Sequence, residues 1–219
     1  PPMAIRVNAL KTTTDRLIER LRAEKVEVDE QRMHVAHTGA LWRLEAFKAG
    51  WFAGQDDAAQ RVVPLLQARP GELIGDLCAA PGGKAAQVAE TEARVVAADS
   101  EAGKVKGMAR SFERLGARAT VLQADAKHPP FKRVFDAVLI DLPCSNSGVL
   151  ARRVEARWRL RERDIRVLSR IQRLILDAAV AVTKPGGRVV YSTCSLEEEE
   201  NGALVREAIA FLRRTSLPI

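Results

Sequence analysis

Residues 73–84, LIGDLCAAPGGK, constrain the fold more than any other segment of this chain. The apolar start is typical of a short buried strand, Gly82 and Gly83 suit a tight turn, and the residues that follow suit a helix. Strand, turn and helix in this order form the first crossover unit of a doubly wound sheet, whose ligands bind beyond the carboxyl ends of the strands. Glycines let a ligand approach the backbone, and amides at a helix start bind anions, although such a turn can also be purely structural.

The rest of the chain repeats this alternation of short apolar runs and helical segments. Further strands are predicted at 95–98, 119–123, 135–140 and 188–192. Alternation of this kind predicts an α/β fold with a parallel sheet, in the strand order 3-2-1-4-5. Between the strands, the apolar spacing predicts helices with these buried positions: Val105, Met108, Phe112 and Leu115; Ile165, Leu168, Ile175, Ala179 and Val182; Leu204, Val205, Ala208, Ile209 and Leu212.

Residues 1–60 differ in pattern and are predicted as a small α+β subdomain before the main domain at 61–219. A strand is expected at 5–10, and Thr14 is a candidate helix cap. His34 and His37 lack a third ligand nearby in sequence, so no metal site is expected. Apolar residues of this part are expected to pack on the main domain: Val26, Val28, Met33, Val35, Trp42, Phe47, Trp51 and Phe52.

Charge and composition narrow the partners and the compartment. The formal charge of +7 and pI near 9.7 favour a polyanionic partner. The three cysteines show no disulfide or zinc spacing, no apolar run approaches the ~20 residues of a membrane span, and no signal peptide is visible, so a cytoplasmic protein without membrane association is expected. Nine arginines lie between residues 152 and 173 around Trp158, and Arg152, Arg153 and Arg157 are predicted to bind RNA. The alternative is a solvated helix face with a buried tryptophan.

Three of the predicted strands are followed by aspartates, and these indicate the kind of cofactor. Asp99 follows the second strand, 16 positions past Gly83, where a carboxylate can hold ribose hydroxyls. The turn reads APGGK and matches neither GxGxxG nor a Walker loop, which disfavours a dinucleotide and favours an adenosine without pyrophosphate. S-adenosylmethionine is such a ligand, with Asp125 near the adenine, unless Asp125 is only a surface turn residue. Glu197 to Glu200 are expected only to complement the start of the last helix.

Two cysteines follow strands that are neighbours in the predicted order. Cys144 lies after Asp141 and Pro143, and Cys194 lies in Thr-Cys-Ser. Thiols in one cleft beside a cofactor turn favour nucleophilic chemistry, although buried cysteines are often inert. An amino-group methyltransferase would be expected to carry an aromatic residue where Cys144 stands.

The segments DLCAAPGGK, DLPCSNSGVL followed by RW, and YSTCSLEEEEN resemble the motifs of the Sun (Fmu) family of RNA cytosine-5 methyltransferases. RVNALK near the N-terminus and QDDAAQ before the first strand are also similar to that family, so the resemblance covers nearly the whole chain. Its ribosomal RNA small subunit methyltransferase B branch is the most similar. The implied fold is a Rossmann-like class I S-adenosylmethionine-dependent methyltransferase, and the implied partner is ribosomal RNA, with transfer RNA as an alternative.

The resemblance also implies roles for individual residues. Cys194 would be the nucleophile that adds to C6 of cytosine, Cys144 would assist release, and Asp141 and Lys84 would lie near the base. DNA cytosine methyltransferases suggest the opposite assignment, with Cys144 as the nucleophile, and Lys84 could instead only order the turn. The residues implied to line the cofactor site are Cys78, Ala79, Ala80, Pro81, Gly82, Gly83, Lys84, Asp99, Asp125 and Asp141.

Two departures from the family pattern lead to a rival hypothesis. Family members usually continue into two further strands after the last helix, so the C-terminal strands are expected to be missing here. The named branch also commonly carries an N-terminal RNA-binding helical domain that this sequence lacks. The alternative function is therefore an RNA-binding module or assembly factor with little or no turnover.

Overall fold

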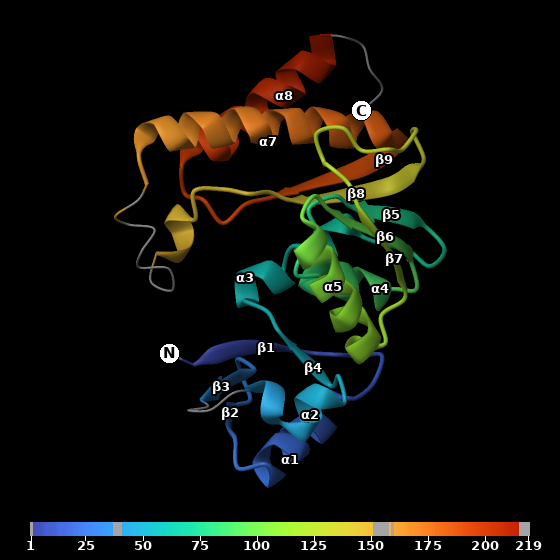
Figure 1. Cartoon of the computed structure of the whole chain (residues 1–219), viewed down its shortest axis with the longest axis vertical. Helices are drawn as coiled ribbons and strands as arrows, with labels where there is room; N and C mark the ends of the chain where they lie inside the picture. Colours follow the sequence, from blue (N-terminus) through green and yellow to red (C-terminus); the bar gives the residue numbers. More distant parts are fainter. Residues whose placement is uncertain (1, 37–40, 151–157, 159, 215–219) are drawn as a thin grey trace.

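The computed structural model describes residues 2–36, 41–150, 158 and 160–214. A five-stranded parallel sheet forms the main body, and a smaller antiparallel sheet near the N-terminus lies below it in Figure 1. The main strands are β5 Leu73–Asp76, β6 Arg94–Asp99, β7 Ala119–Gln123, β8 Phe135–Asp141 and β9 Thr183–Ser192. Their order β7-β6-β5-β8-β9 confirms the predicted arrangement 3-2-1-4-5 and the α/β class.

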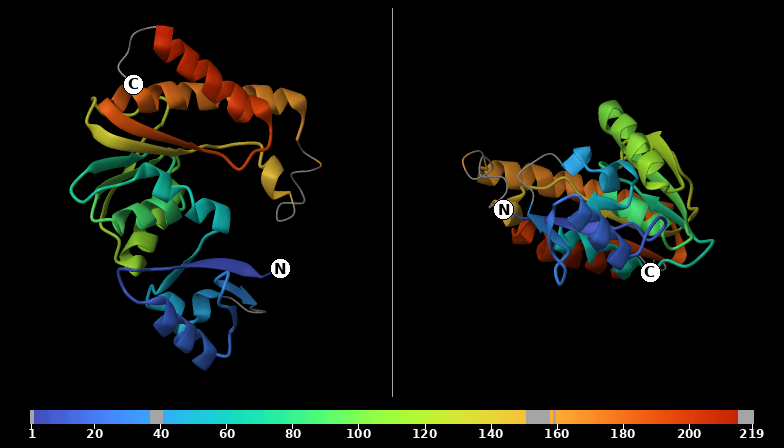
Figure 2. Two further views of the ribbon diagram at one scale, coloured as in Figure 1. Left: turned by 180° about the vertical axis from the view of Figure 1, so that it is seen from behind. Right: turned by 90° about the horizontal axis from the view of Figure 1, so that it is seen from below.

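Helices cover both faces of this sheet, which buries the strands on each side. The helices α4 Gly83–Ala89 and α5 Ala102–Leu115 lie on one face, and α7 Glu162–Val182 and α8 Gly202–Arg214 lie on the other (Figures 1 and 2). Two apolar clusters, one per face, fill the spaces between sheet and helices. Parallel strands buried on both faces read as continuous apolar runs, which explains why they were predictable.

Most predicted helix faces are confirmed, with one correction. Met108, Phe112 and Leu115 of α5 are buried, as are Ile175, Ala179 and Val182 of α7. In α8, Leu204 and Ala208 are buried, whereas Ile209 is 41% exposed. The helix packs on α7 through one narrow stripe, so a position one residue past Ala208 faces solvent.

Prolines were predicted to interrupt the chain at Pro64 and at Pro185, and only the first interruption is confirmed. The helix α3 Asp57–Gln60 is followed by a separate 3-10 turn, Val63–Leu66, with Pro64 in its first turn, as expected from the missing N–H of proline. The residues 184–187, which were predicted as a turn before strand 188–192, lie inside β9. They are accommodated by a shift in register between Phe135 and Ala137 of β8.

The N-terminal part is an α+β unit, as predicted, with its own antiparallel sheet in the order β2-β3-β1-β4. Its strands are β1 Met3–Val7, β2 Glu27–Asp29, β3 His34–Ala36 and β4 Phe52–Gly54, and its helices are α1 Thr14–Ala23 and α2 Glu45–Lys48. The predicted strand 5–10 is confirmed for residues 5–7 and ends there, because the chain turns at Asn8, whose side chain accepts from the Leu10 N–H and donates to the Gly50 carbonyl. The cap of α1 is Thr13 and not Thr14.

The expectation that the N-terminal apolar residues pack on the main domain is wrong. Most of them form a separate core, and Trp42 is 67% exposed. The contact with α5 is largely polar: Asn8 Nδ2 donates to the Leu115 carbonyl at 2.7 Å, and Arg114 stacks on the Phe47 ring. The domain boundary near residue 60 remains a prediction.

Two further observations concern the metal site and the membrane span that the sequence did not predict. His34 Nε2 lies 2.8 Å from Asp57 Oδ2, and His37 lies outside the described residues. Within the described ranges, no cluster of three or more histidine, cysteine or acidic side chains is arranged to hold a metal ion. None of the described helices combines the length and apolarity needed to cross a membrane.

Candidate active site

The turn between β5 and α4 packs tightly against α5. Gly82 has φ +103°, and a Cβ added there would lie 2.8 Å from Phe112 and 2.9 Å from Met108. Only glycine suits this position, because other residues are strained at positive φ and lack the space. The turn is therefore fixed in place by the core of the protein.

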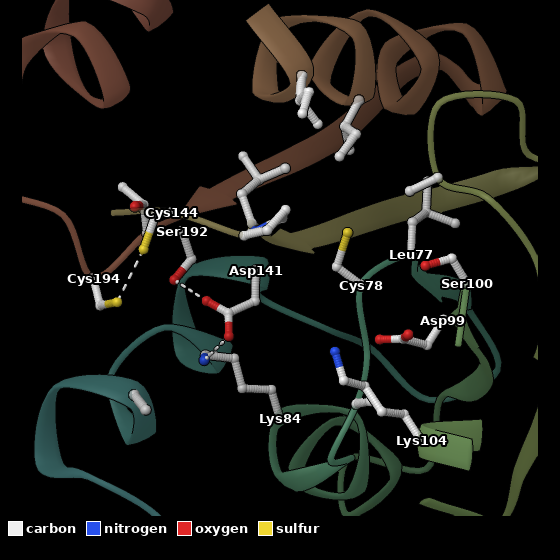
Figure 3. Close-up of a pocket in the computed structure, with 18 of the residues that line it drawn as sticks. Leu77, Cys78, Lys84, Asp99, Ser100, Lys104, Asp141, Cys144, Ser192 and Cys194 are labelled. Atoms are coloured by element: carbon white, nitrogen blue, oxygen red, sulfur yellow. Dashed lines mark hydrogen bonds and ion pairs between the residues drawn. The ribbon is translucent and has the colours of Figure 1, made fainter. Parts of the chain in front are cut away.

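A cavity of about 820 Å³ opens above the carboxyl ends of the strands (Figure 3). Its size suits a small-molecule site. The predicted residues that line it are Cys78, Ala80, Lys84, Asp99, Asp125, Asp141, Cys144 and Cys194. Ala79, Pro81 and Gly83 line an adjoining cavity of about 600 Å³ on the side of the N-terminal subdomain, and Lys84 and Asp141 border both.

Asp99 and Asp125 both line the cavity. Asp99 accepts from the Glu101 N–H at 3.1 Å, so its loop folds back at the end of β6. The Lys127 N–H donates to Asp125 at 2.9 Å and holds the pKa of that carboxyl below its ordinary value. Sequence reasoning missed four further lining residues, although each closely follows one of these aspartates: Ser100, Glu101, Lys104 and Lys127.

Lys84 and Asp141 form an ion pair at the centre of the cavity. Lys84 Nζ lies 2.6 Å from Asp141 Oδ2, and Ser192 Oγ donates to Asp141 Oδ1 at 2.9 Å (Figure 3). The Lys84 side chain is 13% exposed. The pair links the glycine turn to the ends of β8 and β9. The role of Lys84 beside the base stays a prediction.

Asp76, the last residue of β5, was not predicted as part of the site. It is 1% exposed, and among the described residues neither carboxylate oxygen has a hydrogen-bond partner. Burial and then repulsion from Asp141 raise the pKa of Asp76 to about 7, and Lys84 opposes this only in part. The sequence signal was the presence of a carboxylate in an otherwise apolar strand.

Cys144 and Cys194 meet at the other end of the cavity, which confirms that the two thiols share a cleft. Their Sγ atoms lie 3.0 Å apart, and Cys194 Sγ also lies 3.3 Å from Asn146 Oδ1 (Figure 3). The hydrogen bond from Cys194 lowers the pKa of Cys144 to about 6, and the same contact raises the pKa of Cys194. The pair therefore loses one proton near neutral pH and the second with great difficulty.

Cys78 differs from this pair. Burial raises the pKa of Cys78, with Asp76 the next cause, so its thiol stays protonated in the turn that follows β5.

The expectation that the acidic run 197–200 only complements a helix end is wrong for Glu200. Its side chain is fully buried, and it accepts hydrogen bonds from Ser145, Gln172 and Ser195. A run of four identical residues carries no periodic signal that distinguishes the buried one.

Part of the basic stretch lies outside the described residues. The three arginines predicted to bind RNA, Arg152, Arg153 and Arg157, are in that part. Trp158 is 84% exposed, so it is not buried. Arg166 pairs with Glu162 at 2.7 Å along the solvated side of α7, which is the structural role considered for part of this stretch.

The parallel sheet in the order 3-2-1-4-5, the glycine turn and the aspartates at the strand ends define a Rossmann-like methyltransferase of the S-adenosylmethionine-dependent class. Residues 63–217 match the family 16S rRNA methyltransferase RsmB/F. The chain belongs to this family. The similarity extends to curated relatives, because the chain is 38% identical over 98% of its length to ribosomal RNA small subunit methyltransferase B of Salmonella arizonae and covers 52% of that protein.

Solved structures show the same relationship. The crystal structure of PH0851 superposes with a TM-score of 0.91 at 33% identity, covering 96% of this chain and 50% of that one. NSun6 from Pyrococcus horikoshii, solved with the S-adenosylmethionine analogue SFG, superposes with a TM-score of 0.71 at 31% identity, covering 82% of this chain and 49% of that one. The chain thus spans about half the length of these relatives.

Proposed function

We propose that this chain methylates C5 of a cytosine in RNA, with ribosomal RNA as the substrate, through a covalent bond between a cysteine and C6 of the base. The observation that carries the proposal is the pair of thiols 3.0 Å apart at the end of the cavity. Methyl transfer to nitrogen needs no thiol, whereas C5 of cytosine becomes nucleophilic only after a sulfur adds at C6. Two thiols in one site suit a reaction that forms a bond to carbon and later breaks it.

The cavity fits S-adenosylmethionine, which supplies the methyl group when bound. Asp99 and Asp125 both line this cavity, and in this proposal Asp99 accepts hydrogen bonds from the ribose hydroxyls while Asp125 lies near the adenine. The close packing behind Gly82 holds the turn where the amino-acid end of the cofactor would lie. Asp76 and Asp141 add carboxylate oxygens that suit its ammonium group.

On the substrate side, we assign nucleophilic attack to Cys194, whose side chain is the more exposed of the two. As its sulfur bonds to C6, its proton passes to the Cys144 sulfur, the electrons of the C5–C6 double bond move toward N3, and N3 takes a proton from solvent. The Asp141 carboxylate stabilises that proton until C5 has accepted the methyl group, and N3 then returns the proton to solvent. For release, the Cys144 proton is first lost to solvent; the thiolate then takes the C5 proton, the double bond re-forms, and Cys194 leaves as a thiolate.

The lowered pKa of Cys144 favours the opposite assignment, with Cys144 as the nucleophile, because that sulfur carries the thiolate in the free protein. Both assignments use the same pair and the same product. They differ in which variant can form the bond to C6.

Methyl transfer from labelled S-adenosylmethionine to 16S ribosomal RNA transcripts tests the function, with the RNA digested and its nucleosides separated. Label in 5-methylcytidine supports the proposal. RNA binding without label would favour the alternative of a binding module or assembly factor. Label on an exocyclic nitrogen would indicate an amino-group methyltransferase, for which Cys144 occupies the place of the expected aromatic residue.

A further inference from the structure

Glu200 is a fully buried carboxylate directly behind the two cysteines. It ends a 3-10 turn, Glu198–Glu200, between β9 and α8. Its oxygens accept from the Ser145 N–H at 3.0 Å, the Gln172 amide at 2.8 Å and the Ser195 hydroxyl at 2.6 Å. Burying a carboxylate is strongly unfavourable unless hydrogen-bond donors surround it. The three donors to Glu200 are therefore required for its burial.

Two of these donors are the residues that immediately follow the cysteines. Ser145 follows Cys144 in the loop after β8, and Ser195 follows Cys194 in the loop after β9. Their hydroxyls lie 3.0 Å apart, so the loops also contact each other at this point. One carboxylate therefore holds both loops within one residue of each thiol.

Glu200 is anchored to the sheet through its backbone and to α7 through its carboxylate. The Tyr191 hydroxyl of β9 donates to the Glu200 carbonyl at 2.7 Å. Gln172 of α7 is fully buried and also donates to the Pro143 carbonyl at 2.9 Å, just before Cys144. The thiol pair is thus tied through Glu200 to two rigid elements.

We propose that Glu200 is a positioning residue of the two-cysteine site, whose carboxylate fixes the loops after β8 and β9 so that the two thiols stay at hydrogen-bonding distance. The role in methylation rests on the proposed function, but the distance between the thiols does not. The substitution Glu200→Gln keeps the size of the side chain and replaces one of the two acceptor oxygens with an NH₂ group, so a single acceptor remains for the Ser145 N–H and the Ser195 hydroxyl, which make their shortest contacts with different oxygens of Glu200. We expect the loops to separate.

The expected change in the pKa of Cys144 in Glu200→Gln depends on what Glu200 does. A positioning role and a purely electrostatic role of its negative charge predict changes of opposite sign. Loss of the contact with Cys194 removes the main cause of the lowered pKa of Cys144, so separation of the loops raises that pKa toward its ordinary value. Removal of a nearby negative charge would instead lower thiol pKa values. Asp141 and Tyr191, the other titratable groups near the pair, are unchanged by the substitution.

The experiment measures iodoacetamide labelling of Cys144 against pH in the full chain, resolved by peptide mass spectrometry so that Cys78 is counted separately. The control variant is Glu199→Gln, because Glu199 has an exposed side chain one residue away. We expect a midpoint near pH 6 for the wild type and the control, and a midpoint at least one unit higher for Glu200→Gln. An unchanged or lower midpoint for Glu200→Gln would overturn the positioning role.

A second measurement reports the distance directly. Phenylarsine oxide forms two arsenic–sulfur bonds with a close pair of thiols and releases water, so its affinity depends on their separation. We expect at least tenfold weaker capture by Glu200→Gln than by the control, and equal capture would contradict the proposal. If Glu200→Gln does not fold, Ser195→Ala removes the 2.6 Å donor to Glu200, together with the contacts of that hydroxyl to Ser145, Ser147 and the Glu197 N–H, and must shift both readouts in the same direction. Normal thiol readouts in a wild type that methylates no RNA would refute the proposed function and leave the positioning role standing.

Discussion

Replacing Asp76 with asparagine should change how the stability of the protein depends on pH. The pKa of Asp76 is about 7 in the folded protein and 3.8 as the ordinary value. Between these two pKa values the folded state holds a proton that the unfolded state has lost, so the contribution of Asp76 to stability is fully present below about pH 4 and is lost as pH rises through 7. For these two values, the loss between pH 5 and pH 8 is roughly 2.5 kcal/mol.

Urea unfolding of both proteins at several pH values, without cofactor, measures this difference. The asparagine amide does not titrate, so the wild type should lose roughly 2.5 kcal/mol more than Asp76→Asn between pH 5 and pH 8. The comparison is made within each protein because the new amide is itself buried. Titrating groups that do not interact with Asp76 contribute equally to both curves, whereas Asp141, Lys84 and Asp99 interact with it. Parallel curves would refute the assignment of a raised pKa to Asp76.

Two predictions concern ligands. Saturating S-adenosylmethionine should raise the melting temperature of the wild type by several degrees and of Asp99→Ala by much less, since the ribose loses its carboxylate partner; equal shifts would argue against this ribose site. Replacing Arg152, Arg153 and Arg157 with glutamine should weaken binding to single-stranded RNA and reduce the slope of log affinity against log salt by up to about 2. An unchanged slope in a filter-binding titration would remove these residues from the RNA surface.

The positions of the site residues were largely predictable because parallel strands place their carboxyl ends along one edge. Asp99, Asp141 and Cys194 each follow an apolar run, and the strand order then brings them together. Pattern and topology were sufficient because both faces of the sheet are buried.

Features that depend on tertiary contacts were not predictable. Glu200 is buried by Gln172 and by the loop that carries Ser145, which lie 28 and 55 residues away in sequence, while Glu198 and Glu199 are exposed. Ile209 is exposed because only a narrow stripe of α8 is covered, and hydrophobicity alone does not reveal the width of that stripe. The effect of one thiol on the other likewise depends on their 3.0 Å separation, which no spacing encodes.

The central claim is tested most directly by trapping protein bound to RNA in a denaturing gel after incubation with S-adenosylmethionine and the substrate RNA. Cys144→Ala should methylate, release poorly and give a slowly migrating adduct, whereas Cys194→Ala should give neither adduct nor 5-methylcytosine. An adduct in Cys194→Ala and none in Cys144→Ala would reverse the two roles. 5-Methylcytosine formed by the double variant would contradict the covalent mechanism.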